Sequence, residues 1–127
     1  MLFKSYRETE GRLMLCPSIL SADFTELGAA IDLVRESADM LHLDVMDGHF
    51  VPNLSIGPPV ISAIRKRTDL LLEAHLMVSN PLDLLDQYID AGADIITIHA
   101  EACTHLHKAV QEIRKAGRAA GVAINPG

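Results

Sequence analysis

The sequence contains no tryptophan and few other aromatic residues, two tyrosines and three phenylalanines. A hydrophobic core must therefore be built mainly from leucine, isoleucine, valine and alanine. An excess of basic residues is also missing, because 11 lysines and arginines stand against 17 acidic residues, for a formal net charge of −6. Proteins that bind nucleic acid carry a basic patch or stripe. We therefore expect no nucleic-acid partner.

Cysteine is scarce, and the N-terminal region has no long apolar run. Cys16 and Cys103 lie far apart, without the close spacing of a metal site, and are interpreted as reduced thiols of a cytoplasmic protein. The opening stretch "MLFKSYRETEGR" lacks the continuous apolar segment of a signal peptide or a membrane span. We predict no membrane partner, an N-terminal extension over residues 1–12 whose disorder the sequence leaves open, and one domain over residues 13–127.

The domain alternates between short apolar runs and amphipathic stretches. Strands are predicted over residues 13–17, 40–47, 70–78, 93–100 and 119–127. Helices are predicted over residues 23–37, 58–67, 80–92 and 105–117. Asp23 and Asn80 are N-cap residues of two of these helices, and Gly92 ends one of them. Strand and helix in alternation, with mostly apolar strands, predict a parallel sheet covered by helices.

Two parallel architectures fit this pattern, an open doubly wound sheet and a closed (β/α)₈ barrel. Polar residues alternate with apolar ones along three strands and so share one face of the sheet. This face carries His42, Asp44, Glu73, His75, Thr97 and His99, together with the methionines Met46 and Met77. A recurring polar face is typical of a barrel interior with an active site at its C-terminal rim. We therefore predict an α/β protein of the TIM-barrel type, here with about the first four and a half β/α units.

Three residues of that face form a candidate metal site. His42 and Asp44 lie two residues apart near the end of one strand, and His75 lies at the matching end of the next. Neighbouring strands are about 4.8 Å apart, so the three side chains can converge on one ion. Two imidazoles and a carboxylate suit Zn²⁺, Fe²⁺, Mn²⁺ or Co²⁺ better than Ca²⁺. The alternative is two core histidines and a buried ion pair.

Four neighbours of this site keep two interpretations each. Glu73 is either an outer partner of His75 or a polar residue that fills the barrel interior. Met46 and Met77 either shield the metal or are ordinary core methionines. Ser18 either donates a hydrogen bond to a substrate or caps a turn. The remaining histidines, His49, His105 and His107, are interpreted as solvated surface residues.

Several segments together closely resemble the ribulose-phosphate 3-epimerase family. They are "CPSILSADF", "HLDVMDGHFVPNLSIGPPV", "EAHLMV" and "GVAINPG", and the resemblance runs from about Leu15 to the last residue. It implies one divalent metal ion, Zn²⁺ or Fe²⁺ with Mn²⁺ or Co²⁺ as alternatives. The implied ligands are His42, Asp44 and His75. The resemblance also implies that Ser18 and His75 contact the substrate and that Met46 and Met77 line the metal site.

The activity implied by the resemblance is epimerisation at C3 of a ketose phosphate, from D-ribulose 5-phosphate to D-xylulose 5-phosphate. In this family the metal binds the oxygens on C2 and C3, and one aspartate, here Asp44, removes the C3 proton to give an enediolate. A second aspartate returns a proton to the opposite face. A hexulose-phosphate 3-epimerase acting on allulose 6-phosphate is the alternative of the same class.

The resemblance covers only part of a barrel, which typically needs about 200 residues or more. In the family, the remainder supplies the second catalytic aspartate and the glycine-rich phosphate loops. Asp47 and Asp94 are not substitutes, because Asp47 follows its strand and Asp94 begins one at the opposite rim. We expect the chain to act as a homo-oligomer or with a complementary C-terminal half. The alternative is a non-catalytic half-barrel that binds metal or a partner chain.

Overall fold

The computed structural model describes residues 12–127. The predicted extension therefore lies outside the described residues, except for Arg12. Four parallel strands form one sheet. They are β1 (Met40–Met46), β2 (Leu71–Met77), β3 (Ile95–His99) and β4 (Ala119–Ala123). The helices are η2 (Phe24–Glu26), α1 (Leu27–Val34), α2 (Pro58–Arg67), α3 (Leu85–Asp90), η3 (Ala100–Ala102) and α4 (Leu106–Lys115).

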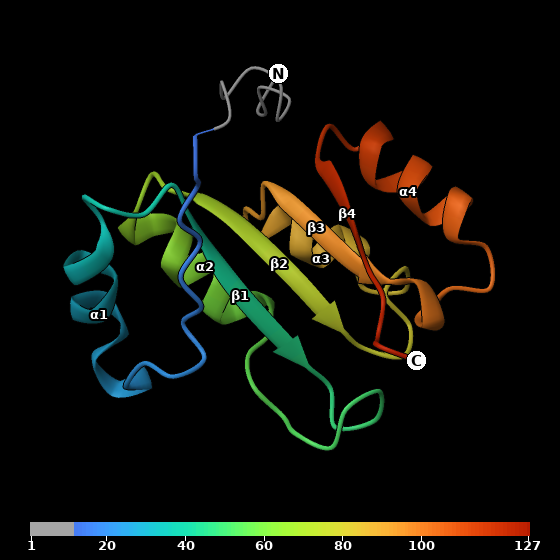
Figure 1. Ribbon diagram of the computed structural model, residues 1–127, viewed down its shortest axis with the longest axis horizontal. Coiled ribbons are helices and arrows are strands. Elements are labelled where there is room, and N and C mark those ends of the chain that lie inside the picture. The colour runs from blue at the N-terminus through green and yellow to red at the C-terminus, as the bar shows by residue number, and fades with distance from the viewer. Residues whose placement is uncertain (1–11) are drawn as a thin grey trace.

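The order of the strands in the sheet is their order in the chain, β1-β2-β3-β4, and every pair is parallel. A doubly wound sheet would reverse this order at a switch point. Here each β/α unit adds to the same edge, as in the wall of a barrel. Figure 1 shows α2 and α3 behind the strands, with the opposite face of the sheet turned to the viewer. The predicted α/β architecture is confirmed.

The core lies between the sheet and its helices. Alternate strand residues such as Leu43, Leu72 and Ile98 are fully buried there, together with helix residues such as Ile61 and Ile113. The other strand residues point to the opposite face of the sheet. Alternation therefore separates an apolar face, which holds the fold together, from the polar face predicted to line a barrel. Among the described residues, no helix is long and apolar enough to cross a membrane.

The first predicted strand is present only as a short parallel contact beside β1. Ser18 and His42 form an isolated bridge. His42 donates its N–H to the Pro17 carbonyl at 2.9 Å, and Ile19 donates to the His42 carbonyl at 3.2 Å. Proline has no N–H, so the ladder loses its next bond at Pro17. The prediction of a regular strand over residues 13–17 was wrong for this reason, although the segment lies where a first strand would.

Asp94, just before β3, ties together the elements at the N-terminal rim of the sheet. Asp94 accepts hydrogen bonds from Arg65 Nη1 and from the Leu72 N–H, each at 2.9 Å. Arg65 reaches this carboxylate by passing close to Gly92, which has a φ of +99°. A Cβ at Gly92 would lie 2.6 Å from Arg65 Cγ. Asp94 therefore lies at the rim away from the candidate site, as predicted, where it binds Arg65 and the start of β2.

Candidate metal centre

Three donor atoms converge at the C-terminal half of β1 and β2. The parallel register sets Asp44 beside His75 and His42 beside Glu73. His42 Nε2 lies 3.1 Å from Asp44 Oδ1 and 3.2 Å from His75 Nδ1, and the third distance, from His75 Nδ1 to Asp44 Oδ1, is 3.3 Å. The structure thus brings together all three residues that the sequence suggested as ligands.

The size of this triangle fits a single divalent ion. Bonds of about 2.0–2.2 Å to nitrogen and oxygen separate tetrahedral ligand atoms by roughly 3.3–3.5 Å and octahedral ones by roughly 3 Å. The three measured distances, 3.1, 3.2 and 3.3 Å, fall between these limits. Hydrogen bonds alone do not satisfy all three atoms, because only one proton can lie between two facing imidazole nitrogens. A cation would satisfy all three lone pairs at once.

Glu73 orients the first histidine. Its Oε2 lies 2.8 Å from His42 Nδ1, and its Oε1 accepts a hydrogen bond from Thr97 Oγ1 at 2.7 Å. The interpretation of Glu73 as a partner of His75 was wrong, because the register places it opposite His42. A carboxylate that holds one ring nitrogen fixes the tautomer and turns the other nitrogen to the metal. Glu73 therefore directs the His42 Nε2 lone pair into the triangle.

The surrounding charges shift the titration of these groups strongly. Hydrogen bonding with Cys16 and with the Glu73 carboxylate, which accepts from Nδ1, raises the pKa of His42 to about 10. The hydrogen bond with His42 lowers the pKa of Glu73 to about 2, against the opposing effect of burial. Burial lowers the pKa of His75. The pocket thus favours a positive charge next to Asp44 and Glu73, which a divalent ion would also supply.

His75 has a second imidazole behind it. Its Nε2 lies 2.8 Å from His99 Nε2, and the two rings stack with centroids 5.0 Å apart. His99 is only 5% exposed, and its Nδ1 lies 3.4 Å from Glu101 Oε2. The alternation along its strand placed His99 on the polar face, but sequence reasoning gave it no role. The signal that could have found it is its position two residues beyond Thr97, level with the end of β3.

Ser18 reaches the site from the segment beside β1. Its hydroxyl donates to Asp44 Oδ2 and also accepts the Leu20 N–H at 3.1 Å. Asp44 therefore uses one oxygen in the triangle and the other toward Ser18. Met46 and Met77 are partners in the parallel register and half-buried, one step beyond the triangle on the same face. Their position fits the predicted lining of the site.

The other predicted polar residues lie outside the triangle. Asp47 accepts backbone N–H groups of His49, Phe50 and Ser79, each at 2.8 Å, and so joins the loops after β1 and β2. Asp47 therefore holds these loops and lies outside the triangle. The three histidines interpreted as surface residues are exposed, as predicted; they are His49, His105 and His107.

A one-directional β/α wall with ligand-type side chains at its C-terminal rim defines this chain as part of an α/β barrel with a candidate metal centre. The family model "Ribulose-phosphate 3 epimerase family" matches residues 14–127. The chain therefore belongs to the ribulose-phosphate 3-epimerase family.

Individual relatives agree with the family match. A protein named ribulose-phosphate 3-epimerase from Bacillus subtilis (strain 168) is 51% identical over 115 residues, which are 90% of this chain and 53% of that protein. One of the same name from Rhodobacter capsulatus is 51% identical over 91% of this chain and 51% of its own length. A chloroplastic ribulose-5-phosphate-3-epimerase from Arabidopsis thaliana is 45% identical over 95% of this chain and 44% of its own length. The chain spans about half the length of the curated relatives it matches.

Proposed function

We propose that the protein of which this chain is part catalyses the epimerisation at C3 of D-ribulose 5-phosphate to D-xylulose 5-phosphate. The supporting observation is the triangle of His42 Nε2, Asp44 Oδ1 and His75 Nδ1, with sides of 3.1–3.3 Å, in a chain of this family. The relatives carry the name of this activity. Because the chain spans about half of their length, the activity is proposed for the completed barrel.

His42, Asp44 and His75 would hold one divalent ion, Zn²⁺ or Fe²⁺, with Mn²⁺ or Co²⁺ as alternatives. When bound, the ion stabilises the negative charge that develops on the sugar oxygens beside C3. Without such stabilisation a carbon next to a ketone is far too weak an acid to lose its proton at neutral pH. Glu73 and His99 hold the two imidazoles in orientation from behind.

Asp44 acts as one acid–base group of the reaction. Its side chain is only 12% exposed, and Ser18 holds its Oδ2. A carboxylate in this position removes the C3 proton to give the enediolate of the sugar. Ser18 keeps the carboxylate aimed and also contacts the substrate, together with His75. Met46 and Met77 exclude water from the metal side of the pocket.

The second half of the reaction needs groups outside the described chain. A second aspartate returns the proton to the opposite face of the enediolate, and glycine-rich loops hold the phosphate. These parts come from the rest of the barrel or from a complementary C-terminal half, and a homo-oligomer stays the alternative assembly. A cytoplasmic location is part of this proposal, although one relative is named as chloroplastic. A hexulose phosphate such as allulose 6-phosphate stays the alternative substrate.

A non-catalytic half-barrel is the competing function, and the observation in its favour is the half-length match to the relatives. Exchange of the C3 proton separates the two. The purified protein, loaded with Mn²⁺, is incubated with D-ribulose 5-phosphate in deuterated water, and deuterium at C3 and xylulose 5-phosphate are followed by NMR. Metal binding with no exchange and no product would favour the half-barrel.

Asp44→Asn is the sharpest variant for this test. It removes the base but keeps the size of the side chain, so exchange is expected to fall at least about 1,000-fold with the fold retained. Asp86→Asn, at an exposed position of α3, is the matched control and should leave exchange unchanged. Substantial exchange by Asp44→Asn would remove Asp44 from its catalytic role.

A further inference from the structure

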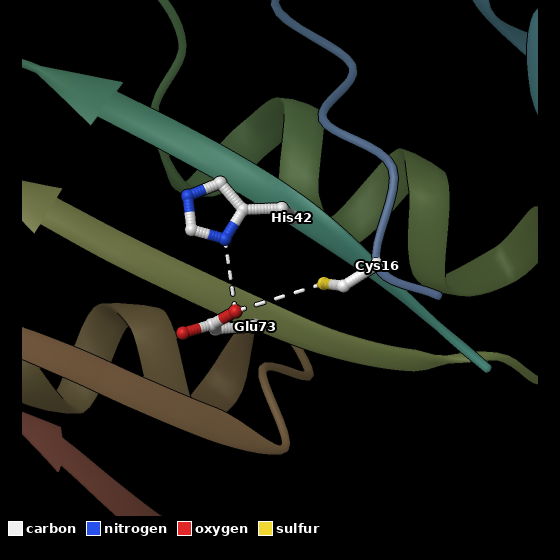
Figure 2. Close-up of side chains that lie close together, drawn as sticks. All are labelled: Cys16, His42 and Glu73. Atoms are coloured by element: carbon white, nitrogen blue, oxygen red, sulfur yellow. Dashed lines mark hydrogen bonds and ion pairs between the residues drawn. The ribbon is translucent and has the colours of Figure 1, made fainter. Parts of the chain in front are cut away.

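His42 presents its two ring nitrogens to two different sets of donor atoms. Nε2 belongs to the triangle with Asp44 and His75. Nδ1 faces Glu73 Oε2 at 2.8 Å, and the sulfur of Cys16 lies 3.7 Å from the same oxygen. Figure 2 shows the Cys16 sulfur and His42 Nδ1 turned toward this one carboxylate oxygen. The second set therefore lies on the other side of the same imidazole.

We propose that Cys16, His42 Nδ1 and Glu73 form a second cation site, which takes a soft divalent ion such as Zn²⁺ or Cd²⁺. Each residue offers one ligand atom within 4.8 Å of the other two. They come from three separate segments, the stretch before β1, β1 itself and β2 (Figure 2). A thiolate, an imidazole and a carboxylate are a donor set that Zn²⁺ accepts in proteins.

The distances are close to those such an ion needs. With Zn–S near 2.3 Å and Zn–O near 2.1 Å, tetrahedral sulfur and oxygen ligands lie about 3.6 Å apart. The measured separation of Cys16 Sγ and Glu73 Oε2 is 3.7 Å. His42 Nδ1 and Glu73 Oε2, now 2.8 Å apart in a hydrogen bond, must separate by about half an ångström to admit the ion. A small rotation of the carboxylate supplies that movement.

Proton balance makes the two sites exclusive. A neutral imidazole binds a metal through one nitrogen and keeps a proton on the other. An ion at Nδ1 releases the thiol proton of Cys16 to solvent, and the single ring proton of the neutral imidazole moves from Nδ1 to Nε2. The sulfur set therefore captures soft ions, whereas the set with Asp44 suits harder ions such as Mn²⁺. Occupation of the second site withdraws His42 from the first.

Cadmium ion alone is the probe for this site, because its bond to a thiolate gives an ultraviolet charge-transfer band. The metal-free protein is titrated with Cd²⁺, and the wild-type chain and the Cys103→Ser control are expected to show the band at about one Cd²⁺ per chain. Cys16→Ser should lose it. His75→Ala should keep it, because His75 belongs only to the other set. No band in the wild type, a band that survives in Cys16→Ser, or its loss in His75→Ala would overturn the proposal.

A second measurement needs no variant and so does not depend on how Cys16→Ser folds. Iodoacetamide alkylation of both cysteines is followed by peptide mass analysis with and without Cd²⁺. Cadmium is expected to slow the alkylation of Cys16 at least about tenfold and to leave Cys103 within about twofold. Equal slowing of both cysteines, or none, would overturn the proposal. Cys16 does not touch the substrate in the proposed epimerisation, so failure of that activity leaves this result unaffected.

Discussion

His75 Nε2 and His99 Nε2 lie 2.8 Å apart, and this contact determines how His75 can present its other nitrogen. Two facing ring nitrogens share one proton. If His75 Nδ1 directs a lone pair to the triangle, the proton must be on its Nε2, and His99 accepts it. The Nδ1 of His99 then carries the other proton, and Glu101 Oε2 lies 3.4 Å from it without a hydrogen bond. His99 therefore sets the tautomer of a candidate metal ligand from outside the triangle.

Replacement of His99 is expected to weaken metal binding although His99 is not a ligand. His99→Leu removes the acceptor for His75 and should lower the affinity for Mn²⁺ by about 10–100-fold. His99→Gln retains an acceptor oxygen and should recover most of that loss. Competition with a chromophoric chelator measures the affinity. Equal affinities of His99→Leu and His99→Gln would show that the buried volume at this position matters and the acceptor does not.

His75→Ala tests the ligand set itself. The change removes one corner of the triangle, so the affinity for Mn²⁺ should fall by more than the roughly 100-fold that outer contacts contribute. Manganese is the ion of choice here, because it suits the oxygen and nitrogen donors of this set. His49→Ala, at an exposed loop position, is the matched control and should bind Mn²⁺ as the wild type does. Unchanged Mn²⁺ affinity of His75→Ala would show that the assigned site is wrong.

Residue alternation was enough to predict which side chains share the polar face, but it could not predict the register. His42, Asp44 and His75 follow from the period of two along β1 and β2, and the structure brings them together. A shift of two residues between the strands would keep the same face. The sequence therefore could not tell that Glu73 faces His42, since the packing of α2 and its loops determines how the strands align.

The structure differs from the sequence-based prediction at Pro17, and it gives His99 a role that the sequence did not. The apolar pattern around Pro17 predicts a strand, but the missing N–H of that proline leaves a single bridge to β1. The alternation of residues 95–99 placed His99 on the polar face, but no sequence pattern assigned it a role there. Its function depends on contact with His75 from the neighbouring strand, and only the fold brings the two rings together.

Ser18 is expected to matter for turnover more than for metal binding. Ser18→Ala removes the hydroxyl that holds Asp44 Oδ2, and a hydrogen bond to a charged group is worth about 1.5–3 kcal/mol. We therefore expect kcat to fall by roughly 10–100-fold with Mn²⁺ affinity nearly unchanged. Ser21→Ala, at an exposed position three residues further, is the control. A loss of metal affinity as large as the loss of kcat would instead place Ser18 in the support of the metal site.

Alanine substitutions at Gly92 and Gly117 can be compared to test how the Arg65 contact contributes to stability. Both follow a helix and have a positive φ, +99° and +76°, which costs a residue with a Cβ about 1–2 kcal/mol. A Cβ at Gly92 would also lie 2.6 Å from Arg65 Cγ, whereas nothing lies within 4 Å at Gly117. Gly92→Ala should therefore lower the free energy of unfolding in urea by at least about 1 kcal/mol more than Gly117→Ala, because Arg65 must leave Asp94. Equal losses would mean that Arg65 moves aside without losing that contact.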